Sequence, residues 1–236
     1  MRGVRVSIGG IDMKVLIKSA AALAMLAVSA GLPAAPAFAE AGDLLVRFRG
    51  IAVAPTGESG GVLPTFPGGS LEAKTSVTPE FDFTYFVTDT IAAELILATS
   101  RHQIEGQGAL AGVGNAADVW LLPPTLTLQY HFNPNGEFRP YVGAGINYTV
   151  FYNESANRNL ANAVGNVTVD ATNSLGWAVQ AGMDYDLGGN WVLNLDAKYI
   201  HLDTNVKLTT GAGVQRTELD LNPLVIGLGV GYRFSL

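Results

Sequence analysis

The sequence has few of the side chains that carry covalent or metal chemistry, and these are scattered. Its 236 residues include no cysteine, which excludes disulfides and thiolate metal or redox chemistry. The three histidines, His102, His131 and His201, are far apart in sequence. Ser100 stands two residues before His102, with Glu105 beyond, so a nucleophile–base pair has to be considered. No G-x-S-x-G motif accompanies that pair, and the acidic residues lack metal-ligand spacing. The sequence therefore predicts neither an enzyme nor a metal or cofactor site.

The charge balance also argues against a nucleic-acid binder. The formal net charge is −6 at pH 7, and only 14% of the residues are charged. An acidic chain with no basic cluster has no general attraction to phosphate backbones. Instead, several polar and charged residues stand singly between apolar neighbours, and these are Arg47, Arg49, Asp82, Glu94, Gln129, His131, Asp196, Lys198 and Arg233.

This alternation predicts β-strands with two unlike faces. In residues 139–151, RPYVGAGINYTVF, the face that carries Tyr148 is apolar, whereas the face that carries Asn147 is small or polar. Residues 175–187 and 224–234 repeat the pattern. Such strands suit lipid on one side and a lumen on the other. The alternative is a soluble sandwich or lipocalin-like fold, but the second face carries few charges for a surface in contact with water.

The same parity predicts eight strands, and single-chain bacterial barrels have an even number. They fall at residues 46–49, 81–85, 94–97, 126–132, 139–151, 175–187, 191–199 and 224–234. Short turns alternate with long connections near residues 56–78, 100–117, 153–172 and 203–217. Short periplasmic turns and long outer loops are the asymmetry expected of outer-membrane barrels. The predicted fold class is therefore all-β, an eight-stranded antiparallel transmembrane β-barrel over residues 40–236.

We expect residues 1–39 to be a leader that is removed on export. Basic residues, an apolar stretch over residues 19–32 and the small-residue site Ala37-Phe38-Ala39 follow one another in the order of a secretory signal peptide. A transmembrane anchor is the alternative, but the apolar stretch is short and two prolines interrupt its end. We expect cleavage after Ala39 and a final location in the cell outer membrane.

Two segments resemble the OmpW family of outer-membrane proteins. They are residues 120–132, WLLPPTLTLQYHF, and residues 138–148, FRPYVGAGINY, on either side of the turn NPNG. The start of the mature chain looks similar too, so the resemblance covers essentially all of residues 40–236. The chain departs from the pattern in one respect. Barrels of this kind usually end in an aromatic residue that the assembly machinery reads, whereas here Phe234 stands two residues before the end.

The resemblance implies a narrow, largely hydrophobic lumen. The family is associated with passage of small hydrophobic molecules into or across the outer membrane, and an opening in the barrel wall would let them leave sideways. The implied partners are outer-membrane lipid, small hydrophobic solutes and the barrel-assembly machinery. A second function remains open, a structural or receptor barrel whose extracellular loops bind partners without transport.

The residues that the alternation places on the inner face of the strands predict two zones in the lumen. An eight-stranded barrel is narrow enough for side chains to fill it, and buried charges must pair. We therefore expect a charge plug formed by Arg47, Arg49, Asp82, Glu94, His131, Asp196, Lys198 and Arg233. Further out, the parity predicts a hydrophobic lumen suited to an apolar ligand, lined by Val119, Leu121, Pro123, Ile200, Leu202, Leu219 and Leu221. Bulges that shift the register would instead turn these residues toward lipid.

Pro123 and Pro124 mark a weak point in the predicted wall. Neither residue can donate a ladder hydrogen bond, so strand pairing is reduced where they lie. They are the candidates for the lateral opening.

Overall fold

The computed structural model describes residues 7–8, 11–12, 40–57, 59–210 and 213–236. The chain divides into two units, Met1–Ala35 and Pro36–Leu236. In the first, β1 (Ser7–Ile8) pairs antiparallel with β2 (Ile11–Asp12). The rest of the predicted leader lies outside the described residues, so its cleavage stays a prediction. None of the described helices is long and apolar enough to cross a bilayer.

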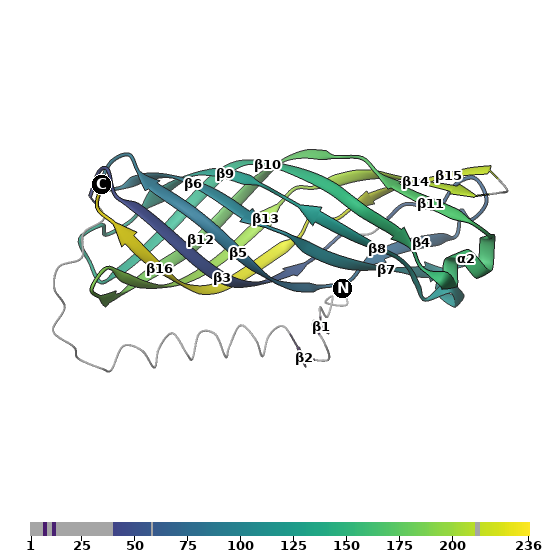
Figure 1. Ribbon diagram of the computed structural model, residues 1–236, viewed down its shortest axis with the longest axis horizontal. Coiled ribbons are helices and arrows are strands. Elements are labelled where there is room, and N and C mark those ends of the chain that lie inside the picture. The colour runs from purple at the N-terminus through teal and green to yellow at the C-terminus, as the bar shows by residue number, and fades with distance from the viewer. Residues whose placement is uncertain (1–6, 9–10, 13–39, 58, 211–212) are drawn as a thin grey trace, which may run out of the picture. The chain divides into compact units, whose positions relative to one another are not determined.

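Eight antiparallel strands of the second unit close into a barrel (Figure 1). They are β3 (Leu44–Ala54), β5 (Ser76–Phe86), β6 (Ile91–Ala98), β9 (Thr125–His131), β10 (Phe138–Ala156), β12 (Ser174–Gly188), β13 (Trp191–Ile200) and β16 (Leu224–Phe234). Their order around the ring is β12, β13, β16, β3, β5, β6, β9 and β10, and β10 pairs back with β12. This confirms the predicted fold class.

The side chains alternate across the barrel wall, because successive residues of a strand point to opposite faces. In β10, Ile146 is 59% exposed on the outside, whereas Thr149 is fully buried inside. Outward aromatic rings cluster toward both ends of this apolar band. Trp191 contacts Tyr232 at one end (ring centroids 5.1 Å apart), and Trp177 contacts Tyr199 at the other (5.6 Å). An apolar band between two aromatic girdles is the surface of a transmembrane barrel.

The four long connections are not simple loops, and this corrects the sequence interpretation. They form β4 (Gly69–Ala73), β7 (Ser100–Gly108), η2 (Ala111–Val113), β8 (Asn115–Leu122), α2 (Arg158–Val164), β11 (Val167–Ala171), β14 (Asp203–Thr210) and β15 (Gly213–Asp220). The strands β8, β7 and β4 continue the sheet from the outer half of β10, and β11, β14 and β15 form a second sheet. Together they extend the wall beyond the barrel (Figure 1).

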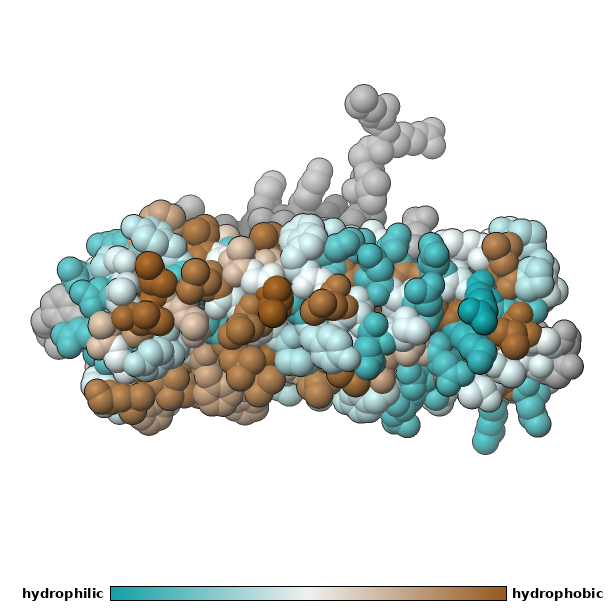
Figure 2. Space-filling model, turned by 90° about the horizontal axis from the view of Figure 1, so that it is seen from above, coloured by the Kyte–Doolittle hydropathy of each residue, from teal (hydrophilic) through white to brown (hydrophobic). Residues whose placement is uncertain are grey.

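The extension has the opposite polarity to the barrel. In β14, Val206 and Leu208 are buried, while Asn205 and Lys207 are exposed. Figure 2 shows hydrophobic side chains gathered over the barrel and hydrophilic ones over the extension. Because polar side chains face outward here, the extension lies in water beyond the hydrocarbon layer.

The short turns lie at the other end of the barrel. Residues 188–190 join β12 to β13, and Gly188, Gly189 and Asn190 all have positive φ, at 84°, 61° and 70°. Glycine and asparagine tolerate this left-handed conformation better than other residues do, so the turn can be this tight. The described chain enters the barrel and leaves it at this end (Figure 1).

A charge placed on the apolar band should destabilise the barrel. We expect Leu228→Arg, on the outer face of β16, to lower the free energy of unfolding in lipid vesicles by about 2–4 kcal/mol. Val214→Arg in β15 is the matched control, since Val214 is similarly exposed but lies on the extension. It should change the free energy by roughly 0.5 kcal/mol or less. Urea titration measures both, and equal losses would contradict the position of the band.

Candidate functional site

The barrel interior contains two layers of different chemistry. The inner layer, nearer the short turns, is a network of buried charges. The outer layer, nearer the extension, is an apolar cavity. The network, called the charge plug below, consists of Arg47, Arg49, Glu80, Asp82, Glu94, Asp184, Asp196 and Lys198.

Arg47, on β3, forms ion pairs with carboxylates on three other strands. Its guanidinium forms a two-pronged contact with Asp184 of β12, with Nε–Oδ1 at 3.1 Å and Nη2–Oδ2 at 2.8 Å. Nη1 lies 2.7 Å from Asp82 Oδ1 on β5 and 3.3 Å from Glu94 Oε1 on β6. The Arg47 side chain is 0% exposed. A planar, always charged guanidinium suits such multiple pairing better than an ammonium does.

Arg49 forms the second centre of the plug. Its Nε lies 2.8 Å from Glu80 Oε1, and its Nη2 lies 2.9 Å from Asp82 Oδ2. Nη2 also approaches Glu94 Oε1 at 3.2 Å, so Asp82 and Glu94 are shared between the two arginines. The other oxygen of Glu94 accepts hydrogen bonds from Thr127, Gln129 and Gln180. A buried charge network is tolerated only when its members are paired in this way.

The inward face of β16 makes room for the arginine stems. A Cβ on Gly229 would lie 2.6 Å from the Cα of Arg49, and one on Gly231 would lie 2.8 Å from the Cγ of Arg47. These approaches are shorter than real side-chain contacts. The glycines that alternate along β16 therefore allow two large side chains to fill the narrow lumen.

Most of the predicted plug residues lie together, but two do not belong to the ion-pair network. His131 is buried and hydrogen-bonds Gln129 through Nε2 at 2.9 Å, so it contacts the plug only indirectly. Arg233 lies outside the network altogether. It is at the turn end, 3.6 Å from Asp43 and 3.0 Å from the Asn190 side-chain oxygen, and it contacts none of the residues of the charge plug.

Sequence reasoning missed two carboxylates of the network. Glu80 lies inward on β5, but the predicted strand began at residue 81 and left it out. Asp184 has the correct inward parity on β12, yet nothing in the sequence indicates that it pairs with Arg47. The position of a residue in the alternation predicts whether it faces the lumen or the lipid. Its partners depend on the stagger between strands.

Beyond the plug, a cavity of about 1110 Å³, including its open mouth, occupies the outer lumen. All seven residues predicted to form a hydrophobic lumen line it: Val119, Leu121, Pro123, Ile200, Leu202, Leu219 and Leu221. Leu121 and Leu202 are 6% and 3% exposed. The extension supplies further apolar walls from β4, β7, β11 and β14. An apolar cavity with few polar groups suits a small hydrophobic ligand.

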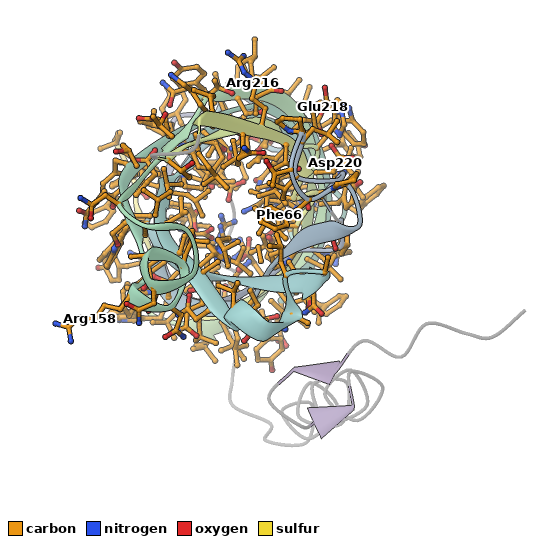
Figure 3. All side chains as sticks on the ribbon, turned by 90° about the vertical axis from the view of Figure 1, so that its right-hand side faces the viewer. Phe66, Arg158, Arg216, Glu218 and Asp220 are labelled. Carbon is orange, nitrogen blue, oxygen red and sulfur yellow. The ribbon has the colours of Figure 1, made fainter. Side chains whose placement is uncertain are left out.

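The segment between β3 and β4 covers part of the cavity mouth. It is held to β15 by backbone hydrogen bonds, from Gly60 N to Glu218 O at 2.9 Å and from Leu63 N to Arg216 O at 3.0 Å. Figure 3 looks onto this end and shows Phe66 pointing inside the ring of strands. This half-buried aromatic ring packs against the buried apolar side chains of the outer lumen.

The Ser100–His102 pair lies in the cavity wall. His102 Nδ1 is 2.7 Å from the Lys74 carbonyl oxygen, which can only accept, so Nδ1 carries a proton and donates. Burial lowers the pKa of His102, on the extension, below its ordinary value of 6.5. Nε2 of the neutral ring then accepts from the Ser100 hydroxyl at 3.0 Å. Glu105 binds Lys74 instead of the pair. In the described parts of the chain, no group of three or more His, Asp or Glu side chains is placed to hold a metal.

Strand pairing is interrupted at Pro123 and Pro124. The β6–β9 ladder ends at Ile96↔Thr125, and the β7–β8 ladder begins at Ser100↔Leu121. The two prolines thus lie between strands and not inside one, which refines the prediction. Pro123 lines the cavity and Pro124 is half-buried beside it.

Side chains replace the missing ladder bonds at this interruption. The carbonyl oxygen of Pro123 accepts from Thr125 Oγ1 at 3.0 Å and from Asn147 Nδ2 at 3.2 Å. On the other border, Thr99 Oγ1 donates to the Leu121 carbonyl oxygen at 3.2 Å. One backbone hydrogen bond, from Tyr148 N to the Pro124 carbonyl oxygen at 3.0 Å, and these three side chains hold this part of the wall, where a regular sheet would have a full ladder.

Comparison with known proteins identifies relatives of this chain. The OmpW family matches residues 40–234. The chain is 44% identical over 191 residues to the uncharacterized outer-membrane protein y4mB of Sinorhizobium fredii, covering 80% of this chain and 79% of that protein. It is 37% identical over 213 residues to outer membrane protein W of Vibrio cholerae, covering 89% and 97%. The crystal structure of OprG from Pseudomonas aeruginosa matches with a TM-score of 0.78 and 29% identity, covering 84% of this chain and 98% of that one.

Loss of one plug arginine should cost far more stability than loss of a surface arginine. We expect Arg47→Met to lower the free energy of unfolding by about 3–5 kcal/mol, because it leaves Asp82 and Asp184 buried with fewer partners. Arg101→Met is the control. Arg101 is 53% exposed and pairs with Asp118 at 3.2 Å, so its loss should cost about 1 kcal/mol at most. Urea unfolding in vesicles compares the two, and a fully stable Arg47 variant would contradict the plug.

Proposed function

Because the chain belongs to the OmpW family of outer-membrane proteins, we propose that it binds small hydrophobic molecules in its apolar cavity and passes them passively between the cell exterior and outer-membrane lipid. The barrel lies in the outer membrane, in contact with its lipid. The observation that carries the proposal is the apolar cavity that ends on the charge plug. This function agrees with what the family resemblance implies.

The cavity favours apolar solutes over ions and water-soluble ones. Its wall is formed mainly by aliphatic side chains, so a strongly polar solute would lose most of its hydration there and gain few hydrogen bonds. An apolar solute gains roughly 25 cal/mol for each Å² of surface removed from water. Selection therefore follows from solvation alone and needs no energy source.

The charge plug blocks the axial route. Its members come from β3, β5, β6, β12 and β13, and their side chains are at most 4% exposed. An apolar molecule that displaced them would leave buried charges unpaired, at a cost of several kcal/mol for each ion. A molecule in the cavity therefore has a lower barrier sideways than along the axis.

The interruption at Pro123 and Pro124 supports a sideways exit. One backbone hydrogen bond and a few side-chain hydrogen bonds hold this part of the wall, and they break and reform more readily than a continuous ladder. Leu97 and Leu122 lie on the outer surface beside it, 38% and 39% exposed, so a molecule that passed through would meet lipid. We assign the lateral opening to this interruption.

A bulky side chain that fills the cavity should slow uptake. We expect Leu121→Trp to reduce the uptake of naphthalene severalfold in cells that carry equal amounts of each variant. Leu228→Trp is the control, because it makes the same change on the outer face of β16, away from the cavity and from the interruption. Equal uptake in both variants would contradict the proposal. Uptake no faster than in cells without the barrel, together with partner binding that loop deletions abolish, would favour the receptor alternative.

Restoring backbone donors at the interruption should close the lateral route. We expect Pro123→Thr combined with Pro124→Thr to slow naphthalene uptake severalfold, because two N–H groups become available for ladder bonds. Pro140→Thr, within β10 near the turn end, is the control and should leave uptake unchanged. Unchanged uptake in the double variant would remove Pro123 and Pro124 from the exit path.

A further inference from the structure

Lys198 stands at the boundary between the charge plug and the cavity. It lies on β13, its side chain is 1% exposed, and it lines the cavity floor together with Glu80. Among the described residues that line the cavity, it is the one lysine or arginine. Its ammonium group therefore faces the space that a bound molecule would occupy.

The ammonium group of Lys198 has no hydrogen-bond partner among the described residues. Nζ lies 3.6 Å from Glu80 Oε2 and 3.7 Å from Asp196 Oδ1, which is within range for charge attraction but too long for a hydrogen bond. An ammonium has three N–H donors, and a buried donor without a partner costs free energy. A ligand atom that accepts a hydrogen bond at this point would recover that cost.

The other side-chain donors of the cavity wall already have partners. Thr125 donates to the Pro123 carbonyl oxygen, and Thr149 donates to Asn147 Oδ1 at 2.7 Å. Thr204 donates to the Thr172 carbonyl oxygen at 2.7 Å. The Ser100 hydroxyl is bound to His102, whose other ring nitrogen is bound to Lys74. Lys198 is therefore the donor that remains available to a ligand within the described cavity wall.

The surrounding charges decide which acceptor fits. The plug contains three cations against five carboxylates: Arg47, Arg49 and Lys198 against Glu80, Asp82, Glu94, Asp184 and Asp196. Two of these carboxylates flank the ammonium directly. A ligand carboxylate would add another buried negative charge to a region that already has an excess. An uncharged oxygen accepts the same hydrogen bond without that repulsion.

We propose that Lys198 makes the cavity select apolar molecules that carry one uncharged oxygen at or near the end of the chain, such as medium-chain alcohols and methyl ketones. These are selected over both plain hydrocarbons and carboxylates. The oxygen accepts a hydrogen bond from Lys198 Nζ at the floor, and the hydrocarbon body lies against the aliphatic wall above it. This specificity rests on the proposed function, because it requires that hydrophobic molecules enter the cavity.

The test compares ligands of one chain length. The full chain in lipid nanodiscs is titrated with octane, 1-octanol, 2-octanone and octanoate, and methyl NMR signals of the cavity residues report binding, with each affinity corrected for partition into lipid. We expect the wild type to bind 1-octanol and 2-octanone about tenfold more tightly than octane, the gain from one hydrogen bond to a charged donor. Octanoate should bind more weakly than 1-octanol.

Three variants separate recognition by Lys198 from a merely structural role. Lys198→Met should abolish the preference for 1-octanol over octane, and Lys198→Gln, which retains N–H donors, should keep part of it. Arg101→Met removes a cation outside the cavity and should keep the whole preference. Resistance of the folded barrel to SDS without heating shows that each variant is folded.

The outcomes distinguish this inference from the function on which it rests. If the wild type and Lys198→Met show the same ratio of octane to 1-octanol affinity, or if octanoate binds most tightly, the role of Lys198 is wrong while cavity binding stands. If none of the four compounds shifts the cavity signals of the wild type, the proposed function fails as well.

Discussion

The pairing of Arg47 and Arg49 with shared carboxylates determines how the lumen is divided. Two guanidinium groups in a barrel this narrow can be buried only if acceptors converge on them, and Asp82 and Glu94 contact both. The glycines of β16 are a consequence, because any larger side chain at Gly229 or Gly231 would collide with the arginine stems. With the inner lumen filled by this network, the outer lumen is left as an apolar space that is closed at its inner end. The plug is therefore the floor of the cavity.

The barrel could be predicted from the sequence because lipid imposes a strict rule on every strand. Each outward residue must be apolar, so period-two alternation is visible along the whole chain, from Val142 to Tyr148 in β10 and from Leu228 to Phe234 in β16. The short turns carry residues that tolerate positive φ, such as Asn133 and Asn190. These local signals were enough to predict eight strands and, on their inner faces, six of the eight plug residues, Glu80 and Asp184 being the two that were missed.

Two parts of the site could not be predicted, for different physical reasons. The extension strands follow the opposite rule, with polar side chains outward, and in β14 the residues that face water resemble those of a loop. The partners of each buried charge depend on strand stagger, which brings Arg47 to Asp184 although 137 positions separate them. Alternation predicts on which side of the barrel wall a residue lies, but it does not predict the position of that residue along the barrel axis. Arg233 illustrates the difference, since its parity is inward but its height places it at the turn end.

The plug and the interruption at Pro123 and Pro124 are two parts of one constraint on passage. Because the plug closes the lumen along the barrel axis, a molecule in the cavity can reach the membrane only if the barrel wall opens. A closed barrel has no strand edge at which this opening could start. The prolines supply the local exception, because they remove two backbone donors at the height of the cavity and leave the ladder below intact. The carbonyl oxygen of Pro123 still has partners in Thr125 and Asn147, so the closed wall bears no unsatisfied acceptor there. The wall can therefore be stable when closed and need only a few hydrogen bonds to break when it opens, the backbone bond from Tyr148 N to the Pro124 carbonyl oxygen among them.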